Sequence, residues 1–149
     1  TNMLSKVIQA LMPAKKMIDM FTYKIISDLP TEKITEKVPT VCEQNKFALL
    51  QTYVYHEIVE SKGFPIKRKV FIYEICQAKT AAGMLTDNPE SSIFMPCKIS
   101  IYEENGKTVI STMNMEIMLD AIKSNQSLYN EAITLFNTLK SLMNSLSAN

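Results

Sequence analysis

The chain has 149 residues, of which 46% are hydrophobic and 21% are charged, and its formal net charge is +1. This composition is typical of one globular domain that buries a core, and it argues against a disordered chain. The balanced charge argues against a dedicated nucleic-acid binder, and no apolar run reaches the roughly 18 residues of a membrane span. Three cysteines, an odd number, leave at least one free thiol, so we expect a reducing, cytoplasmic location.

The first residues predict an amphipathic helix that ends near Pro13. Its apolar side chains recur at helical spacing, and they are Met3, Leu4, Val7, Ile8, Leu11 and Met12. We assign residues 1–16 to this helix and residues 17–149 to a single α+β domain. The favoured role of the helix is packing on its own domain or on a second copy of the chain. A peripheral contact with a membrane surface is the weaker alternative.

The next segment predicts a strand over residues 20–27 and then a helix that Asp28 or Thr31 caps. Pro39 lies inside the helical pattern and is expected to kink or divide the helix, because proline lacks an N–H. Asn45 is expected to end the helix in a left-handed conformation. Residues 47–56 predict a second strand that reaches the only histidine, His56, and one helical turn follows it.

The centre of the chain predicts three further strands, over residues 70–76, 97–103 and 108–112. Asn105-Gly106 between the last two favours a type I′ turn, because both positions of that turn need a positive φ. An alanine-rich helix is expected over residues 78–85, between the first two of these strands. Met95-Pro96 then requires an extended entry into the next strand.

The last third of the chain predicts a long apolar helical stripe over residues 115–146. Residues 124–127 are expected to interrupt it, with Asn125 as the cap of a second segment. A helix of about 30 residues spans roughly 45 Å, which exceeds the width of one small sheet. Part of this stripe, or the N-terminal helix, is therefore available to a partner, and we predict a homodimer.

Several motifs resemble the bacterial and archaeal family named domain of unknown function 302. They are Glu74-Ile75-Cys76, Asn88-Pro89, residues 95–107 and residues 111–114, and His56-Glu57 also fits the family's pattern. The resemblance covers roughly Met17 to the C-terminal helix. The chain departs from the family in the loop after Cys76. The resemblance implies a TBP-like β-α-β(4)-α fold, in which a curved antiparallel sheet of about five strands packs on a long C-terminal helix. It implies no activity.

Two cysteines and the histidine are the candidate binding residues. Cys76 ends one predicted strand and Cys97 begins the next, so the two thiols are expected at one sheet edge. Such a pair would form a reversible disulfide, carry a persulfide or bind a soft metal, and the alternative is that both thiols pack as small apolar groups. His56 would ligate haem iron or a metal, and the alternative is an ordinary hydrogen-bonded histidine. Most of the ten methionines are expected to fill the core.

Three functions are open from the sequence. The first is a non-enzymatic module that binds a small apolar ligand, haem or a soft transition metal between the sheet and the C-terminal helix. His56, Cys76 and Cys97 are its candidate cofactor-binding residues, and tyrosine and methionine side chains are expected in the same cleft. The second is a thiol protein that senses redox state or carries sulfur on Cys76 and Cys97. The third is a structural homodimer. The sequence contains no glycine-rich phosphate loop or nucleophile elbow, which disfavours an enzyme.

Overall fold

The computed structural model describes residues 2–11 and 13–149, so Met12 of the predicted N-terminal helix lies outside the described residues. One antiparallel sheet forms a layer in which the strands follow the order β1-β5-β4-β3-β2. The strands are β1 (Thr22–Ser27), β2 (Ala48–Val54), β3 (Val70–Cys76), β4 (Cys97–Glu104) and β5 (Lys107–Met113). This five-stranded sheet confirms the predicted α+β fold class.

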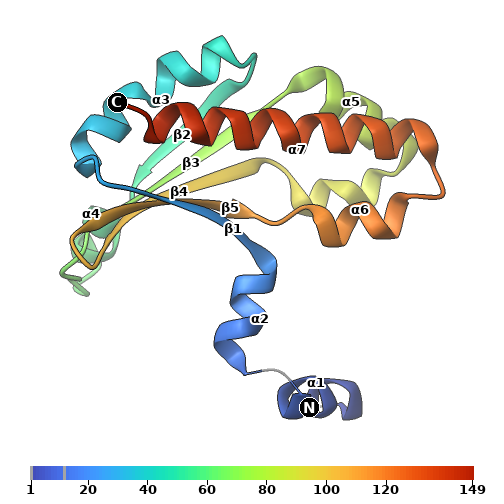
Figure 1. The fold of residues 1–149 in the computed structure, drawn as a ribbon, viewed down its shortest axis with the longest axis horizontal. Coiled ribbons are helices and arrows are strands. Elements are labelled where there is room, and N and C mark those ends of the chain that lie inside the picture. The colour runs from blue at the N-terminus through green and yellow to red at the C-terminus, as the bar shows by residue number, and fades with distance from the viewer. Residues whose placement is uncertain (1, 12) are drawn as a thin grey trace.

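Helices form the second layer (Figure 1). They are α3 (Thr31–Gln44), α5 (Ala78–Asp87), the short 3-10 helix η1 (Pro89–Phe94), α6 (Glu116–Ile122) and α7 (Gln126–Ser147). Figure 1 shows α7 lying along the curved sheet, with α3 and α5 beside its two ends. The small helix α4 (Tyr55–Ser61) lies at one end of the sheet, where it contacts β2 and β3.

The core lies between α7 and the facing side of the sheet. Alternate strand residues point into it, since successive side chains of a strand face opposite sides. Ile75, Ile99, Ile101 and Ile110 are fully buried on the sheet, and Leu139, Leu142, Met143 and Leu146 are their counterparts, 0–1% exposed, on α7. Burial of a side chain of this size contributes roughly 1.5–3 kcal/mol to folding.

Two local predictions are confirmed by the backbone. Asn105 and Gly106 have φ values of 53° and 74°, as the β4–β5 turn of type I′ requires. The C-terminal stripe is divided into α6 and α7, and the Asn125 side chain accepts a hydrogen bond from the N–H of Leu128 at 3.1 Å. That bond caps α7.

The start of the domain differs from the prediction. The first strand begins at Thr22 and not at residue 20, because residues Ala14–Phe21 form a second N-terminal helix, α2. Pro30 occupies the cap position of α3 and no side chain caps that helix. The hydroxyl of Thr31 lies 3.3 Å from that of Thr108 instead, so it ties α3 to the sheet.

The end of α3 also differs from the prediction. The helix runs unbroken from Thr31 to Gln44, so Pro39 does not divide it. Buried Val38 and Val41 on either side hold the helix against the core, and that packing compensates for the missing backbone bond. Asn45 keeps a φ of −101°, and it is Lys46 that adopts the left-handed conformation, with a φ of 60°.

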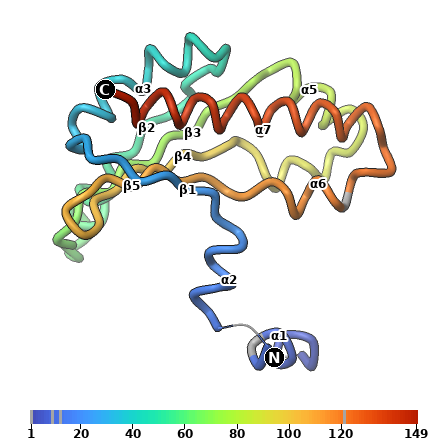
Figure 2. The backbone as a smooth tube through the Cα atoms, viewed as in Figure 1, coloured from blue at the N-terminus to red at the C-terminus, as the bar shows by residue number. Residues whose placement is uncertain are grey.

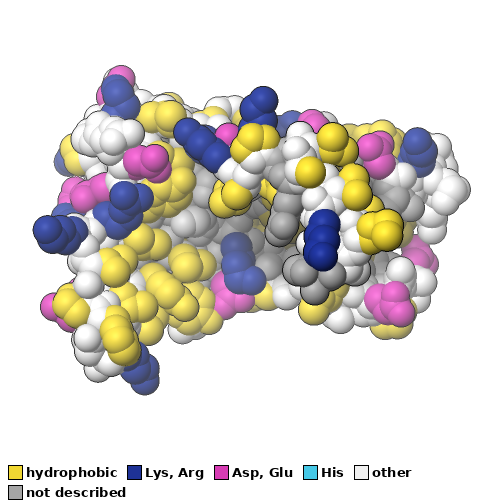
Figure 3. Space-filling view, turned by 90° about the horizontal axis from the view of Figure 1, so that it is seen from below, with side chains coloured by type: hydrophobic (Ala, Val, Ile, Leu, Met, Phe, Trp, Pro, Cys, Tyr) yellow, Lys and Arg dark blue, Asp and Glu magenta, His cyan; other side chains and the backbone are white. Residues whose placement is uncertain are grey.

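The N-terminal helices α1 (Met3–Leu11) and α2 form an arm that projects away from the body (Figure 2). None of its described side chains is buried, and Leu4, Leu11 and Ile18 are 65–80% exposed. Figure 3 views the molecule from the side of the arm and shows hydrophobic side chains interspersed with charged ones over that face. Within the described residues, no helix is long and apolar enough to cross a membrane.

Truncation of a buried sheet residue tests this core. We expect Ile110→Ala to lower the free energy of unfolding by about 2–5 kcal/mol, because it opens a cavity at a fully buried position. Ile26→Ala is the matched control on the neighbouring strand, and Ile26 is 61% exposed. It should cost less than about 1 kcal/mol. Equal losses for the two variants in urea unfolding would contradict the assigned faces of the sheet.

Candidate functional site

A cavity of about 480 Å³ lies where the sheet, α5, η1, α6 and α7 meet. Its wall combines the last residues of β3, the first residues of β4, the end of β5 and the inner sides of the helices. The alanine-rich sequence of α5 explains the space, because Ala81 presents only a methyl group where a larger residue would fill it. This volume falls within the range of small-molecule pockets, about 300–1,000 Å³.

The lining is almost entirely apolar. Lys98 is the only charged residue among the described lining residues, and Gln77, Ser91 and Thr112 are the polar ones. The hydroxyl of Thr112 donates to the carbonyl oxygen of Lys98 at 2.6 Å, and Gln77 accepts a hydrogen bond from Thr80 at 3.1 Å. Ser91 donates to the carbonyl oxygen of Asn88 at 2.7 Å, so the side-chain oxygens of these three polar residues are already paired within the protein. Among the described residues, no buried side-chain nitrogen or oxygen lacks a partner.

Exposed apolar side chains mark the mouth of the cavity. Leu85, Ile93 and Phe94 line it and are 39%, 80% and 47% exposed, so α5 and η1 form one lip. Leu50 of β2 and Met113 of β5 also line it, and they are 53% and 40% exposed. An apolar ligand that enters here would cover hydrophobic surface that water now contacts.

Sulfur is concentrated in the wall, and we call this site the sulfur-lined cavity. The sulfur-containing residues in the described lining are Cys76, Met84, Met95, Cys97, Met113, Met115 and Met118. The sequence predicted most methionines in the core and some in the cleft, but it did not indicate which methionines would gather there. The density of methionine over residues 113–118 was the available signal. Met84 and Met95 lie on other elements, so only the folded chain brings them into the same wall.

The structure brings Cys76 and Cys97 to the same end of neighbouring strands, as the sequence predicted. Cys97 lies on the face of β4 that carries Ile99 and Ile101, and it packs against the core. Burial raises the pKa of the Cys97 thiol, and negative charge on nearby Cys76 raises it further. The Cys97 thiol therefore keeps its proton at neutral pH, which lowers its reactivity as a nucleophile.

The strand register separates the two thiols by face. Cys97 pairs directly with Ile75, so the next residue, Cys76, points to the other side of the sheet. A disulfide needs Cβ atoms that face one another at about 3.5–4.5 Å, so this register disfavours one between these cysteines. The third cysteine, Cys42, is buried in α3, and burial raises the pKa of its thiol as well.

His56 does not join the cysteines. The second strand ends at Val54, so His56 lies in the first turn of α4 and not in a strand as predicted. Its Nδ1 accepts a hydrogen bond from the N–H of Val70 at 3.0 Å, and its ring packs edge-on against Phe71 with centroids 5.3 Å apart. Val70 begins β3, whereas Cys76 ends it, a separation of roughly 20 Å at about 3.3 Å per residue.

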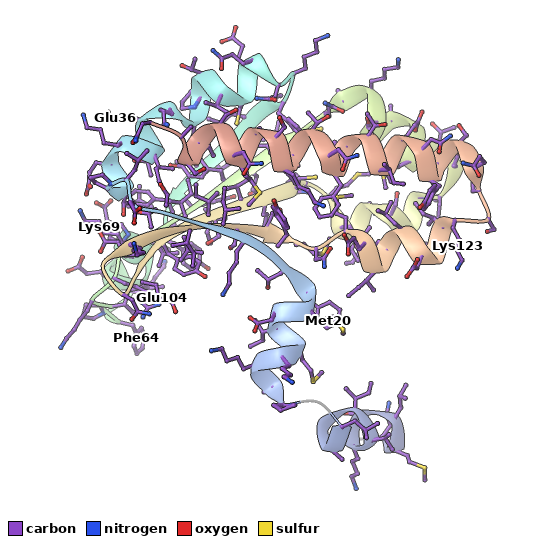
Figure 4. All side chains as sticks on the ribbon, in the orientation of Figure 1. Met20, Glu36, Phe64, Lys69, Glu104 and Lys123 are labelled. Carbon is purple, nitrogen blue, oxygen red and sulfur yellow. The ribbon has the colours of Figure 1, made fainter. Side chains whose placement is uncertain are left out.

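Figure 4 shows this separation along the molecule. Lys69 and Phe64 mark the end of the sheet that holds His56, and Lys123 marks the opposite end, beside α6 and the cavity. No tyrosine appears among the described lining residues, although tyrosines were expected there. Within residues 2–11 and 13–149, no group of three or more His, Cys, Asp or Glu residues is arranged to hold a metal ion.

Comparison with known proteins identifies a family and a solved relative. The family model described as "Domain of unknown function DUF302" matches residues 21–146. The crystal structure of an uncharacterized conserved DUF302 protein from Bacillus stearothermophilus is similar to this chain, with a TM-score of 0.74 and 26% sequence identity. The match covers 87% of this chain and 99% of that chain. No curated protein matches the chain at a significant level.

Thiol labelling tests the placement of the cysteines. We expect Cys42 and Cys97 of the folded protein to react with iodoacetamide at pH 8 at least about tenfold more slowly than in urea, because burial keeps both thiols protonated and shielded. Mass spectrometry of tryptic peptides over time measures each site. Labelling of Cys97 at the rate found in urea would contradict its placement in the cavity wall.

Proposed function

This chain belongs to the DUF302 family, which is defined by a shared domain and not by an activity. From that premise we propose that it is a non-enzymatic module that binds a small apolar ligand in the sulfur-lined cavity. The single observation that carries the proposal is an apolar space of about 480 Å³ whose lining side-chain oxygens are already hydrogen-bonded. Water gains little in such a space, since an ordered water needs two to four polar partners.

The same observation defines the ligand. A polar ligand would lose its hydration without gaining partners, which costs several kcal/mol per buried group. An apolar ligand has little favourable hydration to lose, and its burial contributes roughly 25 cal/mol for each Å² of apolar surface removed from water. Lys98 follows Cys97 in β4, so its side chain points to the opposite face of the sheet, and its carbonyl oxygen already accepts the Thr112 hydroxyl.

Two alternatives predicted from the sequence, haem binding and thiol exchange, receive less support. Haem would use His56 as an axial ligand, but His56 lies at the other end of β3 with Nδ1 already bonded to Val70. A thiol-exchange role would need Cys76 and Cys97 on one face, and the register with Ile75 directs them apart. The apolar ligand therefore remains the function that this geometry supports best.

Filling the cavity should abolish binding. We expect Ala81→Phe to weaken the binding of a neutral naphthylamine dye by at least about tenfold, because losing roughly 60 Å² of apolar contact is worth about 1.5 kcal/mol. Fluorescence titration of the dye measures this. Ala82→Phe is the matched control, because Ala82 is the next residue of α5 but is exposed and lies outside the described lining.

His56→Ala provides a second control, since it removes the histidine at the far end of the sheet and should leave dye affinity unchanged. Equal loss of dye binding in Ala81→Phe and Ala82→Phe would show that the dye binds the arm or the outer surface. That outcome would contradict the proposal.

Self-association is a second candidate function, and the arm favours it. Helices of 9 and 8 residues are marginal in water unless an apolar face is packed, and α1 and α2 bury none of their described side chains in their own chain. A second copy would supply the missing contact. The family match begins at residue 21, so the arm lies outside the matched domain.

Removal of residues 1–16 tests this candidate. We expect light scattering after size exclusion to give a dimer for the full chain and a monomer for the truncated chain, because the apolar face of α1 is lost. The unfolding temperature of the truncated protein should fall by less than about 2 °C once the dimer contribution is removed, since none of the described side chains of α1 is buried. A monomeric full chain would contradict the candidate.

A further inference from the structure

The sulfur-lined cavity holds more sulfur than an apolar pocket requires. The chain has three cysteines and ten methionines, and seven of these thirteen residues belong to the described lining, or six without Cys76, which points to the other face of the sheet. The lining comprises 20 of the 149 residues, so an even spread would place about two sulfur-containing residues there. Leucine or isoleucine would line an apolar pocket equally well. The concentration therefore points to a ligand that prefers sulfur.

Three of these residues come from three different parts of the fold, and two of them, both methionines, are buried. Met84 of α5 and Met115, which precedes α6, are each 6% exposed. Cys97 begins β4 and packs against the core cluster that contains Met115. The other sulfur-containing residues include exposed Met113, which lies toward the mouth. One half-buried thiol and two buried thioethers thus line the same cavity.

The chemistry of these donors selects the ion. Thiolate and thioether ligands are soft, and they favour Cu(I) over harder cations such as Mg²⁺ or Mn²⁺. Charge balance selects a monovalent ion as well. When Cu(I) replaces the proton of one cysteine, the thiol loses H⁺ to solvent, a sulfur–copper bond forms and the site stays neutral. A divalent ion on the same thiolate would leave a positive charge in an apolar wall, which is costly without a second anion.

We propose that the buried end of the sulfur-lined cavity binds one soft monovalent d¹⁰ cation, Cu(I), through the Cys97 thiolate and the thioethers of Met84 and Met115. No electron is transferred in this step, because copper enters and stays as Cu(I). The proposal rests on the proposed function only in using the same cavity, and it names a ligand that the apolar space alone would not predict. Histidine takes no part, since His56 lies roughly 20 Å along β3 from the cysteines.

Competition for Cu(I) tests the proposal. The full-length protein is titrated without oxygen into the coloured Cu(I) complex of bicinchoninate, and loss of colour reports copper transfer. We expect one copper per chain, and we expect Cys97→Ala to weaken binding by more than about tenfold. Cys42→Ala is the matched control, because Cys42 is 1% exposed and lies in α3, outside the described cavity lining. It should bind as the parent protein does.

A methionine series separates copper binding from apolar binding. Met84→Leu/Met115→Leu keeps the wall apolar and removes two thioethers, so we expect copper affinity to fall by about tenfold or more while the naphthylamine dye still binds. Met143→Leu is its control, because Met143 is fully buried in α7 but lies outside the described lining. This series stays decisive if Cys97→Ala fails to fold.

Each outcome decides one claim. Copper binding that survives Cys97→Ala, or that falls equally in Cys42→Ala and Met143→Leu, would overturn the copper site. Failure to take copper from bicinchoninate would also overturn it, and dye binding blocked by Ala81→Phe would then leave the apolar ligand as the function. Copper binding without dye binding would retain the copper site and remove the apolar-ligand function.

Discussion

Packing of α7 against the curved sheet is the constraint on which the rest of this structure depends. A 22-residue helix is long enough to cross the whole sheet, and its apolar face shares one core cluster with residues of all five strands. At the end near its C-terminus, α3 closes the space with Ile34, Val38 and Val41, and the core there is dense. At the other end the covering elements are α5 and η1. Their small and exposed residues leave the wall incomplete.

The cavity is therefore a consequence of how the two ends of α7 are covered. At the cavity end of α7, α5 presents Ala81 with its single methyl group. At the opposite end, α3 presents larger, branched side chains. A void is unfavourable in a protein core, because its lining loses dispersion contacts. Removing it would need only a larger residue on α5, which the helix accommodates locally. The cavity lies beside the exposed apolar residues of its mouth, and this combination is why we assign ligand binding to this part of the fold.

The sequence predicted the elements whose signals are local. The Asn105-Gly106 turn, the β3 strand and the division before Asn125 follow from a few adjacent residues each, and all three are found. The errors arise where tertiary packing decides. Pro39 stays inside a continuous α3 because the core holds Val38 and Val41, and His56 falls into α4 because the preceding strand stops at Val54. The hydrophobic periodicity of the sequence predicts neither effect.

The binding site was only half predictable for the same reason. Strand alternation placed Cys97 toward the core, and neighbouring strands brought Cys76 to the same end. The methionines come from α5, from the approach to β4 and from the segment after β5, so no sequence window contains them. Methionine is unbranched and polarizable, which lets one wall adapt to the shape of an apolar ligand and also offers lone pairs to a soft ion. Leucine adapts its shape less well than methionine, and it has no lone pairs to offer an ion. Exchange between these two residues therefore separates the two kinds of ligand, since both keep the cavity dry.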